Sequence, residues 1–199
     1  GTLTVAGGGA GQDVLTVEGT AGDDTLTTPS ATSVTLIGTV TIGTGIDRLE
    51  ILTGSGNDSI TFSQPIAIPK SIDAGAGNDT INLAAAGTSD TTILGGAGDD
   101  TITGSPGDDL IDGGDGDDLV RQSTNADHQV LANSLLTGLG TDNLTRIERA
   151  ELTGGFSGNR LDATAFTVGP VTLDGNAGND TLLGSAGDDL LEGGTGFDQ

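Results

Sequence analysis

The chain contains no cysteine, methionine, tryptophan or tyrosine, and its only aromatic residues are four phenylalanines. Without cysteine, neither disulfides nor thiolate metal sites are available to hold a fold together. With a single histidine, His128, a zinc or copper cluster is also excluded. So few aromatic rings give a sugar no platform to stack on. Another source of stability is needed.

Positive charge is nearly as scarce, with 6 basic against 29 acidic residues and a formal net charge of −23. This sign argues against nucleic acid and against anionic lipid as partners. A hydrophobic content of 33% is low for so charged a chain, so a disordered acidic chain is the first alternative. Against it, Leu, Ile, Val and Thr recur in short runs bounded by Gly and Asp turns, which predicts β structure.

Long apolar runs are absent as well: no stretch approaches the roughly 20 apolar residues of a membrane span. No signal peptide is visible, the chain does not begin with Met, and it stops at Gln199 directly after a glycine turn. We expect it to be a piece of a longer protein.

What the chain has instead is a nine-residue repeat. Residues 95–121 are three copies in succession, GGAGDDTIT, GSPGDDLID and GGDGDDLVR. Their sixth position is always Asp (Asp100, Asp109, Asp118), and their eighth is always a large aliphatic residue. A second triplet, residues 175–199, reads GNAGNDTLL, GSAGDDLLE and GGTGFDQ, with Asp180, Asp189 and Asp198 at the sixth position.

Looser copies precede or separate the two triplets. They are GGAGQDVLT (Asp13), GTAGDDTLT (Asp24), IGTGIDRLE (Asp47), TGSGNDSIT (Asp58), AGAGNDTIN (Asp79) and TGLGTDNLT (Asp142). Together the copies place twelve aspartates at one position of one motif.

These nonamers resemble the repeats-in-toxin (RTX, hemolysin-type) calcium-binding repeat, G-G-x-G-x-D-x-U-x, which forms parallel β-helices. The resemblance is strong over 95–121 and 175–199 and partial over 8–82 and 137–183. It implies an all-β, right-handed parallel β-solenoid (β-roll or β-helix) with coils of about 18–21 residues. Each x-U-x would be a short strand and each G-G-x-G-x-D a turn, with calcium between stacked turns.

The spacing of the aspartates agrees with such coils. Intervals of 21, 21 and 18 residues separate Asp58, Asp79, Asp100 and Asp118, and intervals of 21 and 18 separate Asn159, Asp180 and Asp198. One coil of this length returns each residue to the same edge, so each set is expected to form a stacked column. Asp109 and Asp189 are nine residues out of phase and are expected on the opposite edge.

A longer repeat is also present, because residues 46–82 align without gaps with 147–183 at an offset of 101 residues. We therefore expect one continuous solenoid over 1–199, made of two stacked modules. The first is 1–121, ending in the triplet 95–121, and the second is 137–199, ending in 175–199. The segment 122–136, which holds His128, breaks the pattern and is predicted to be a loop or an irregular coil.

The residue types of the turn suit calcium, which takes six to eight oxygen ligands. Glycine allows the positive φ that turns carbonyls inward, and Asp supplies a short carboxylate. Oxygen-only ligation favours Ca²⁺ over Mg²⁺, which dehydrates reluctantly. The resemblance implies a shell made of the sixth-position Asp side chains of two stacked turns together with carbonyls of the first four turn positions. In the clearest pair of turns these carbonyls belong to Gly95, Gly96, Ala97, Gly98, Gly113, Gly114, Asp115 and Gly116.

The acids at the fifth position are expected to play a different part. They are Asp23, Asp99, Asp108, Asp117 and Asp188. Other copies carry Gln12, Ile46 or Phe197 there, so this position is interpreted as outward-facing and solvated. At the sixth position Asn159 replaces Asp, and a site there is expected to be weaker or absent.

So many carboxylates repel one another until cations arrive, and roughly ten Ca²⁺ would neutralise the excess. We expect metal binding to supply folding free energy, as in small metallo-domains. Extracellular calcium modules bind at about 10⁻⁴ to 10⁻³ M, so the chain would fold outside the cell. The resemblance implies export by a bacterial type I system to the cell surface or the medium.

Three classes of function remain open. The first is a structural module of a secreted adhesin, surface-layer, matrix or filament protein, and the second is a C-terminal stabilising and secretion segment of a secreted protease, lipase or epimerase. Catalysis by the chain itself is not expected, because His128 is alone and neither G-x-S-x-G nor H-E-x-x-H occurs.

A third, minor class is an ice-binding solenoid, suggested by Thr25-Leu26-Thr27, Thr39-Val40-Thr41 and Thr101-Ile102-Thr103, although Thr is also common on exposed strands.

The last turn, 193–198, lacks the aliphatic residue that should follow it. We expect that end to be continued by further chain or by another subunit in a head-to-tail filament.

Overall fold

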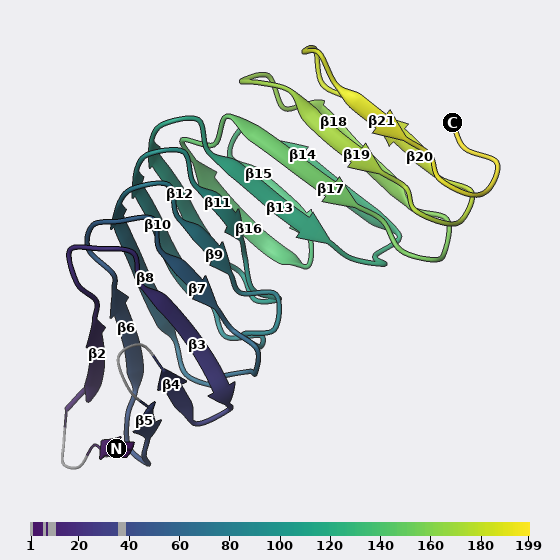
Figure 1. Cartoon of the computed structure of the whole chain (residues 1–199). Helices are drawn as coiled ribbons and strands as arrows, with labels where there is room; N and C mark the ends of the chain where they lie inside the picture. The colour runs from purple at the N-terminus through teal and green to yellow at the C-terminus, as the bar shows by residue number, and fades with distance from the viewer. Residues whose placement is uncertain (1, 6, 8–10, 36–38) are drawn as a thin grey trace.

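The computed structural model describes residues 2–5, 7, 11–35 and 39–199. Within these residues every regular element is a β-strand, and there is no helix of the length and apolarity that a membrane crossing needs. The strands form two long sheets that face each other along the molecule (Figure 1). The predicted all-β parallel solenoid is confirmed.

The first sheet has eleven strands. In spatial order they are β1 (Thr2–Val5), β5 (Thr39–Ile42), β4 (Ser33–Thr35), β3 (Thr25–Ser30), β7 (Ser59–Thr61), β9 (Thr80–Asn82), β11 (Thr101–Thr103), β13 (Leu119–Ser123), β17 (Arg149–Thr153), β19 (Val171–Asp174) and β21 (Leu190–Glu192).

The second sheet has ten strands. In order they are β2 (Val14–Glu18), β6 (Arg48–Leu52), β8 (Lys70–Ala76), β10 (Thr91–Ala97), β12 (Leu110–Asp115), β16 (Gly140–Thr145), β15 (Leu135–Gly138), β14 (His128–Ala132), β18 (Arg160–Ala165) and β20 (Thr181–Leu183).

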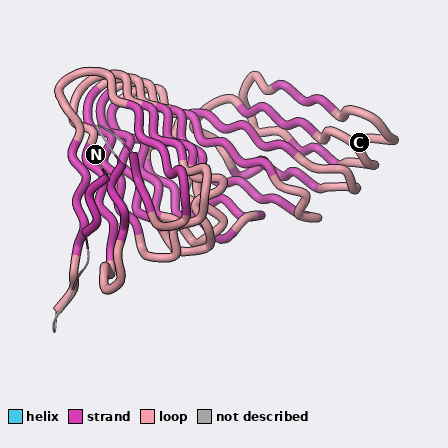
Figure 2. Tube along the Cα trace, turned by 60° about the horizontal axis from the view of Figure 1, so that its bottom comes forward, coloured by secondary structure: helices cyan, strands magenta, loops and turns pink. Residues whose placement is uncertain are grey.

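In a regular coil the chain contributes one strand to each sheet. Turns that lead from the ten-stranded to the eleven-stranded sheet form one side of the solenoid, here called the first edge, and the return turns form the second edge. Figure 2 shows the turns of successive coils stacked in rows. The turn that begins with residues 8–10, ahead of Asp13, lies partly outside the described residues.

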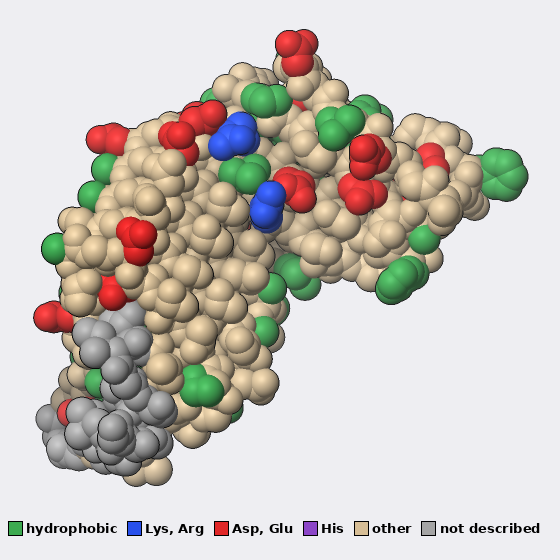
Figure 3. All heavy atoms as spheres, viewed as in Figure 1, with side chains coloured by type: hydrophobic (Ala, Val, Ile, Leu, Met, Phe, Trp, Pro, Cys, Tyr) green, Lys and Arg blue, Asp and Glu red, His purple; other side chains and the backbone are tan. Residues whose placement is uncertain are grey.

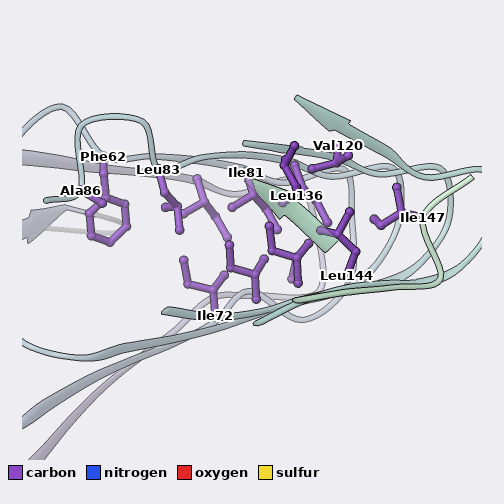
Figure 4. Close-up of a cluster of buried hydrophobic side chains, with 14 of the residues drawn as sticks. Phe62, Ile72, Ile81, Leu83, Ala86, Val120, Leu136, Leu144 and Ile147 are labelled. Atoms are coloured by element: carbon purple, nitrogen blue, oxygen red, sulfur yellow. The ribbon is translucent and has the colours of Figure 1, made fainter. Parts of the chain in front are cut away.

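The core is made of ladders of aliphatic side chains, because alternate residues of each strand point inward. In the eleven-stranded sheet Ile60 pairs with Ile81, which pairs with Ile102. In the ten-stranded sheet Ile72 pairs with Ile93. All five side chains are at most 1% exposed, and the two ladders meet in the interior with Phe62 and Leu83 (Figure 4). Each coil therefore buries its apolar side chains against its neighbours in the stack.

Two alternatives were predicted for 122–136, a loop and an irregular coil, and the loop is wrong because the segment contains strands. Residues 128–132 form β14, which pairs antiparallel with β15, and β15 pairs antiparallel with β16. Val130 and Leu131 supply the β-prone sequence, and Leu131 is fully buried. Because this meander adds strands to the ten-stranded sheet only, the stack bends there (Figure 1). A similar antiparallel meander, β3–β4–β5, lies in the other sheet near the N-terminus.

The sequence repeat of 101 residues does not return the chain to the same sheet. Strand β6 aligns with β17 in sequence, but β6 belongs to the ten-stranded sheet and β17 to the eleven-stranded one. Strands β7, β8 and β9 are exchanged with β18, β19 and β20 in the same way. Equivalent turns of the two predicted modules therefore lie on opposite edges; the division into modules itself stays a prediction.

Candidate metal centres

Five stacked turns on the first edge carry a ladder of aspartates. The backbone N–H of each sixth-position Asp donates to Oδ1 of the sixth-position Asp in the next coil. The distances are 2.7 Å from Asp24 to Asp58, 2.7 Å from Asp58 to Asp79, 2.8 Å from Asp79 to Asp100 and 2.8 Å from Asp100 to Asp118. The last four side chains are at most 2% exposed. The column expected from the spacing is therefore present.

The other carboxylate oxygen of these residues has no partner. Oδ2 of Asp58, Asp79, Asp100 and Asp118 is buried without a hydrogen bond, and so is Oδ2 of Asp180 on the second edge. A buried carboxylate oxygen is strongly destabilising unless it is paired or binds a metal. Each of these oxygens therefore requires a cation or a proton.

The first glycine of the turn leaves room for that cation. A β-carbon added at Gly95 would collide with Oδ2 of Asp100 and with the carbonyl oxygen of Gly113 in the next coil. At Gly175 the corresponding atoms, Oδ2 of Asp180 and the carbonyl oxygen of Gly193, lie 2.6 Å from the added carbon. Carboxylate and carbonyl oxygens of two successive coils thus converge on one space, and this oxygen-only set fits Ca²⁺.

The backbone of these turns is held in a conformation that glycine favours. The φ angles are +119° at Gly96, +127° at Gly98 and +117° at Gly114. The carbonyl of Ala97 accepts the N–H of Gly77 at 2.7 Å, and the carbonyl of Asp115 that of Gly98 at 2.8 Å. Third-position carbonyls therefore already take part in the ladder between coils. The eight carbonyls proposed as ligands, Gly95 to Gly98 and Gly113 to Gly116, stay a prediction.

Not all sixth-position aspartates lack partners, and the second turn position makes the difference. Oδ2 of Asp109 accepts the N–H of Ser105 at 2.6 Å, and Oδ1 accepts the Ser105 hydroxyl at 2.9 Å. Asp189 receives the hydroxyl of Ser185 at 2.8 Å, and Asp24 receives the N–H of Thr20 at 2.6 Å. Where this position has a positive φ, as at Gly54, Gly75, Gly96, Gly114 and Asn176, the carboxylate keeps a free oxygen.

Asp109 and Asp189 lie on opposite edges because the second half of the chain has exchanged its sheets. Asp109 is on the second edge, where its N–H donates to Oδ1 of Asp142 at 3.0 Å. Asp189 is on the first edge, where Oδ1 accepts the N–H of Val171 at 2.9 Å. Each therefore lies on the edge opposite to the other two sixth-position aspartates of its triplet, as the nine-residue spacing predicts.

Other predicted residues complete the second edge. Asn159 donates its N–H to Asp180 Oδ1 at 2.7 Å, and Asp180 donates to Asp198 Oδ1 at 3.0 Å. Asp13 donates its N–H to Oδ2 of Asp47 at 2.9 Å. Asp142 is only 3% exposed but lies in β16 of the antiparallel meander, so its glycine motif is a hairpin and not a turn between sheets.

The fifth-position side chains are exposed, as expected, but they also form a ladder of their own. Oδ1 of Asp23 accepts the N–H of Asn57, and Oδ1 of Asn57 accepts that of Asn78, both at 2.8 Å. The series continues to Asp99 and Asp117 at 3.0 Å each. This outer ladder points along the stack in the opposite direction to the inner one. Ile46 is an exception at the same position, since it is only 8% exposed.

Burial shifts the acidity of the inner carboxyls. It raises the pKa of Asp79 to about 6 and that of Asp100 to about 7, against the opposing effect of the backbone N–H groups they accept. Neighbouring carboxylates of the column raise both values further. Burial also raises the pKa of Asp118, and on the second edge that of Asp142 to about 7. The calcium-free column is thus a poor environment for negative charge.

Two residues of these edges were missed by reasoning from the sequence. Glu148 closes the first-edge column, where its Oε2 accepts the N–H of Asp118 at 3.0 Å. Lys70 lies on the second edge and is only 3% exposed. Neither lies in a glycine-rich nonamer. The interval of 30 residues from Asp118 to Glu148 also differs from that of a regular coil, because the meander β14–β16 lies between them.

No cluster of three or more His, Cys, Asp or Glu side chains suited to a metal occurs in the described part of the chain. A family model of the RTX calcium-binding nonapeptide repeat matches residues 71–85, 86–120 and 172–199. This chain carries RTX calcium-binding repeats. They bind Ca²⁺, and the predicted cofactor is confirmed.

The matched RTX segments include four of the five aspartates with a free buried oxygen, namely Asp79, Asp100, Asp118 and Asp180. RTX repeats are typical of secreted bacterial proteins and are generally structural. No curated protein matches the chain in sequence. The assignment of individual aspartates as ligands stays a prediction, and the free oxygens rank Asp58, Asp79, Asp100, Asp118 and Asp180 first.

Proposed function

We propose that the chain is a calcium-dependent structural module of an extracellular protein, of the kind found in adhesins, surface layers, matrices or filaments. The observation that carries this proposal is the run of unpaired buried carboxylate oxygens on stacked coils. The solenoid strands extend over both halves of the described chain, so few described residues lie outside the solenoid. Calcium would then join successive coils, and the folded length would depend on the calcium concentration outside the cell.

Limited proteolysis tests this proposal. At about 1 mM free Ca²⁺, the extracellular range, the chain should resist a protease, and at submicromolar Ca²⁺ it should be cut throughout. Mg²⁺ at the same concentration should not protect, because it gives up its water reluctantly. Equal resistance at both calcium concentrations contradicts an extracellular calcium-dependent module.

The main alternative is a stabilising and secretion segment of a secreted enzyme. The two are distinguished by the natural polypeptide that contains these residues: further repeats on both sides support the structural role, and a protease, lipase or epimerase domain supports the appendage. The same calcium dependence is expected in either case. Mass spectrometry of the native secreted polypeptide separates them.

Assembly along the solenoid axis is part of the structural proposal. On β21, the outermost strand of its sheet, Leu190 is 52% and Leu191 46% exposed. We propose that a further coil covers them, either from a longer chain or from a neighbouring molecule. Sedimentation velocity at rising protein concentration in calcium tests the filament version, which a purely monomeric species contradicts.

A second candidate, ice binding, is favoured by one feature of the strand register. Thr25, Ser59, Thr80 and Thr101 are aligned across β3, β7, β9 and β11, and so are Thr27, Thr61, Asn82 and Thr103. The series ends at β13, where Leu119 and Arg121 follow. The side chains of 39–41 lie outside the described residues. Thermal hysteresis of the calcium-loaded chain supports this candidate, and its absence removes it.

A further inference from the structure

Lys70 occupies the level of the second edge that belongs to an aspartate in other coils. The strand register pairs Lys70 with Thr91, and the N–H of Thr91 donates to Oδ1 of Asp109 at 2.8 Å. Lys70, Thr91 and Asp109 therefore lie one above another in three successive coils. Lys70 thus lies two coils away from Asp109 at the same level of the edge, and this buried cation is only 3% exposed.

The ammonium group binds backbone carbonyls at turn positions that are predicted calcium ligands in other coils. Its Nζ donates to the carbonyl oxygens of Ile66 and Ile68 in its own turn, and to that of Ser89 in the next coil, each at 3.3 Å. Ile66 and Ile68 precede Lys70 by four and two residues. In the turn that ends at Asp100, the same offsets fall on Gly96 and Gly98, two of the predicted calcium ligands.

The surrounding charges are those of a cation site. Burial lowers the pKa of Lys70, and the negative charges of Asp109 and Asp90 oppose this effect. Lys70 in turn opposes the rise that burial causes in the pKa of Asp109. A buried ammonium is tolerated only when other oxygens replace its water, and here the three carbonyls do so.

We propose that the Lys70 ammonium is a covalently attached substitute for calcium, which joins the turns at 66–70 and 88–91 where the chain has no calcium ligand. The coils of β8 and β10 are then joined by metal on the first edge and by Lys70 on the second. The stacked turns at 66–70 and 88–91 therefore require no calcium ion, and this part of the second edge binds none. This level of the stack is then held together without metal.

Thermal unfolding in saturating calcium compares K70M with R48M. Arg48 is a matched control, because it carries the same charge on the same edge but is exposed and makes one long ion pair with Glu50 at 3.5 Å. K70M should lower the midpoint by about 10 °C, because it leaves the buried carbonyls of Ile66, Ile68 and Ser89 without their donor. R48M should change it by about 2 °C or less. Equal shifts for the two variants overturn the proposal.

Calcium counting gives a second, independent readout. K70D introduces a sixth-position carboxylate, and it should bind one more calcium ion than the wild type by equilibrium dialysis, whereas K70N should add none. A K70D chain that has the circular dichroism spectrum of the wild type but the same ion count overturns the proposal; if K70D does not fold, the K70M comparison decides. A wild type that binds no calcium refutes the calcium function and leaves that comparison intact.

Discussion

At the scale of the residue, the two adjacent aspartates of each nonamer have separate tasks. Asp100 is buried, accepts one N–H through Oδ1 and keeps Oδ2 free for a cation, whereas Asp99 is exposed and belongs to the outer ladder. The second turn position decides whether the inner carboxylate is free. A hydroxyl at Ser105 satisfies Asp109, and Gly96 leaves Asp100 unsatisfied. The sixth-position aspartates are therefore not equivalent sites.

Replacement of each member of this pair by Asn separates the two tasks. D100N keeps an acceptor for the N–H of Asp79 but loses the charge at the free oxygen, so the calcium midpoint for folding should rise roughly tenfold or more. D99N keeps the outer ladder and should change the midpoint by about twofold or less. Circular dichroism during a calcium titration measures both. Equal midpoints for the two variants would show that Asp100 is not a ligand.

The raised carboxyl pKa values predict how the calcium-free chain responds to pH. In the fold the pKa is about 6 for Asp79 and about 7 for Asp100. In the unfolded chain an Asp has a pKa near 3.9. The calcium-free fold therefore binds more protons, so its stability relative to the unfolded chain is greatest below about pH 4 and is lost as the pH rises through 6 to 7.

In metal-free buffer we expect more β signal at pH 5 than at pH 8, measured by far-ultraviolet circular dichroism. Protons would take the place of calcium at the free oxygens. A calcium-free chain with the same or less β signal at pH 5 than at pH 8 contradicts this prediction.

At the scale of the element, the glycine turn is the unit that the sequence predicts best. A nonamer that matches the motif closely, such as 95–103, predicts the strand, the turn and the buried Asp together, because each of these features has a fixed position in the nine-residue repeat. The meander β14–β16 could not be predicted in this way. Its Gly138 and Gly140 resemble a calcium turn but close a hairpin, and the alternation that makes β14 a strand is interrupted by polar residues such as Gln129, which is fully buried.

A glycine variant tests the turn as a cation cradle. G95A places a methyl group between Oδ2 of Asp100 and the carbonyl of Gly113, so it fills the space and pushes these two oxygens apart. Gly95 has no positive φ, so its own backbone conformation also suits alanine. At Gly22 in the first described turn of this edge, an added β-carbon meets nothing within 4 Å, and G22A is the matched control. Isothermal titration should show at least one calcium ion fewer for G95A and the wild-type number for G22A. An unchanged ion count in G95A would place the site elsewhere.

At the scale of the whole molecule, the sequence period and the spatial period differ. The offset of 101 residues correctly identifies equivalent strands, but an odd number of crossings between the two sheets separates β6 from β17, so Asp58 and Asn159 lie on opposite edges. The sheet to which a strand belongs is decided by its pairing with strands distant in sequence, and a local sequence pattern does not predict that pairing. Basic residues visible in Figure 3 lie near the middle of the molecule beside acidic ones. The structure also has ion pairs between residues of neighbouring coils, namely Arg121–Glu151, Arg146–Asp112 and Arg149–Asp117.

The central claim is that calcium binding and folding are one event, because a chain with a net charge of −23 buries carboxylate oxygens that have no other partner. A far-ultraviolet circular dichroism titration at neutral pH tests it most directly. We predict a largely disordered spectrum in chelator and a cooperative change to a β-rich spectrum as free Ca²⁺ approaches about 1 mM. The same β-rich spectrum in chelator and in calcium would contradict the account.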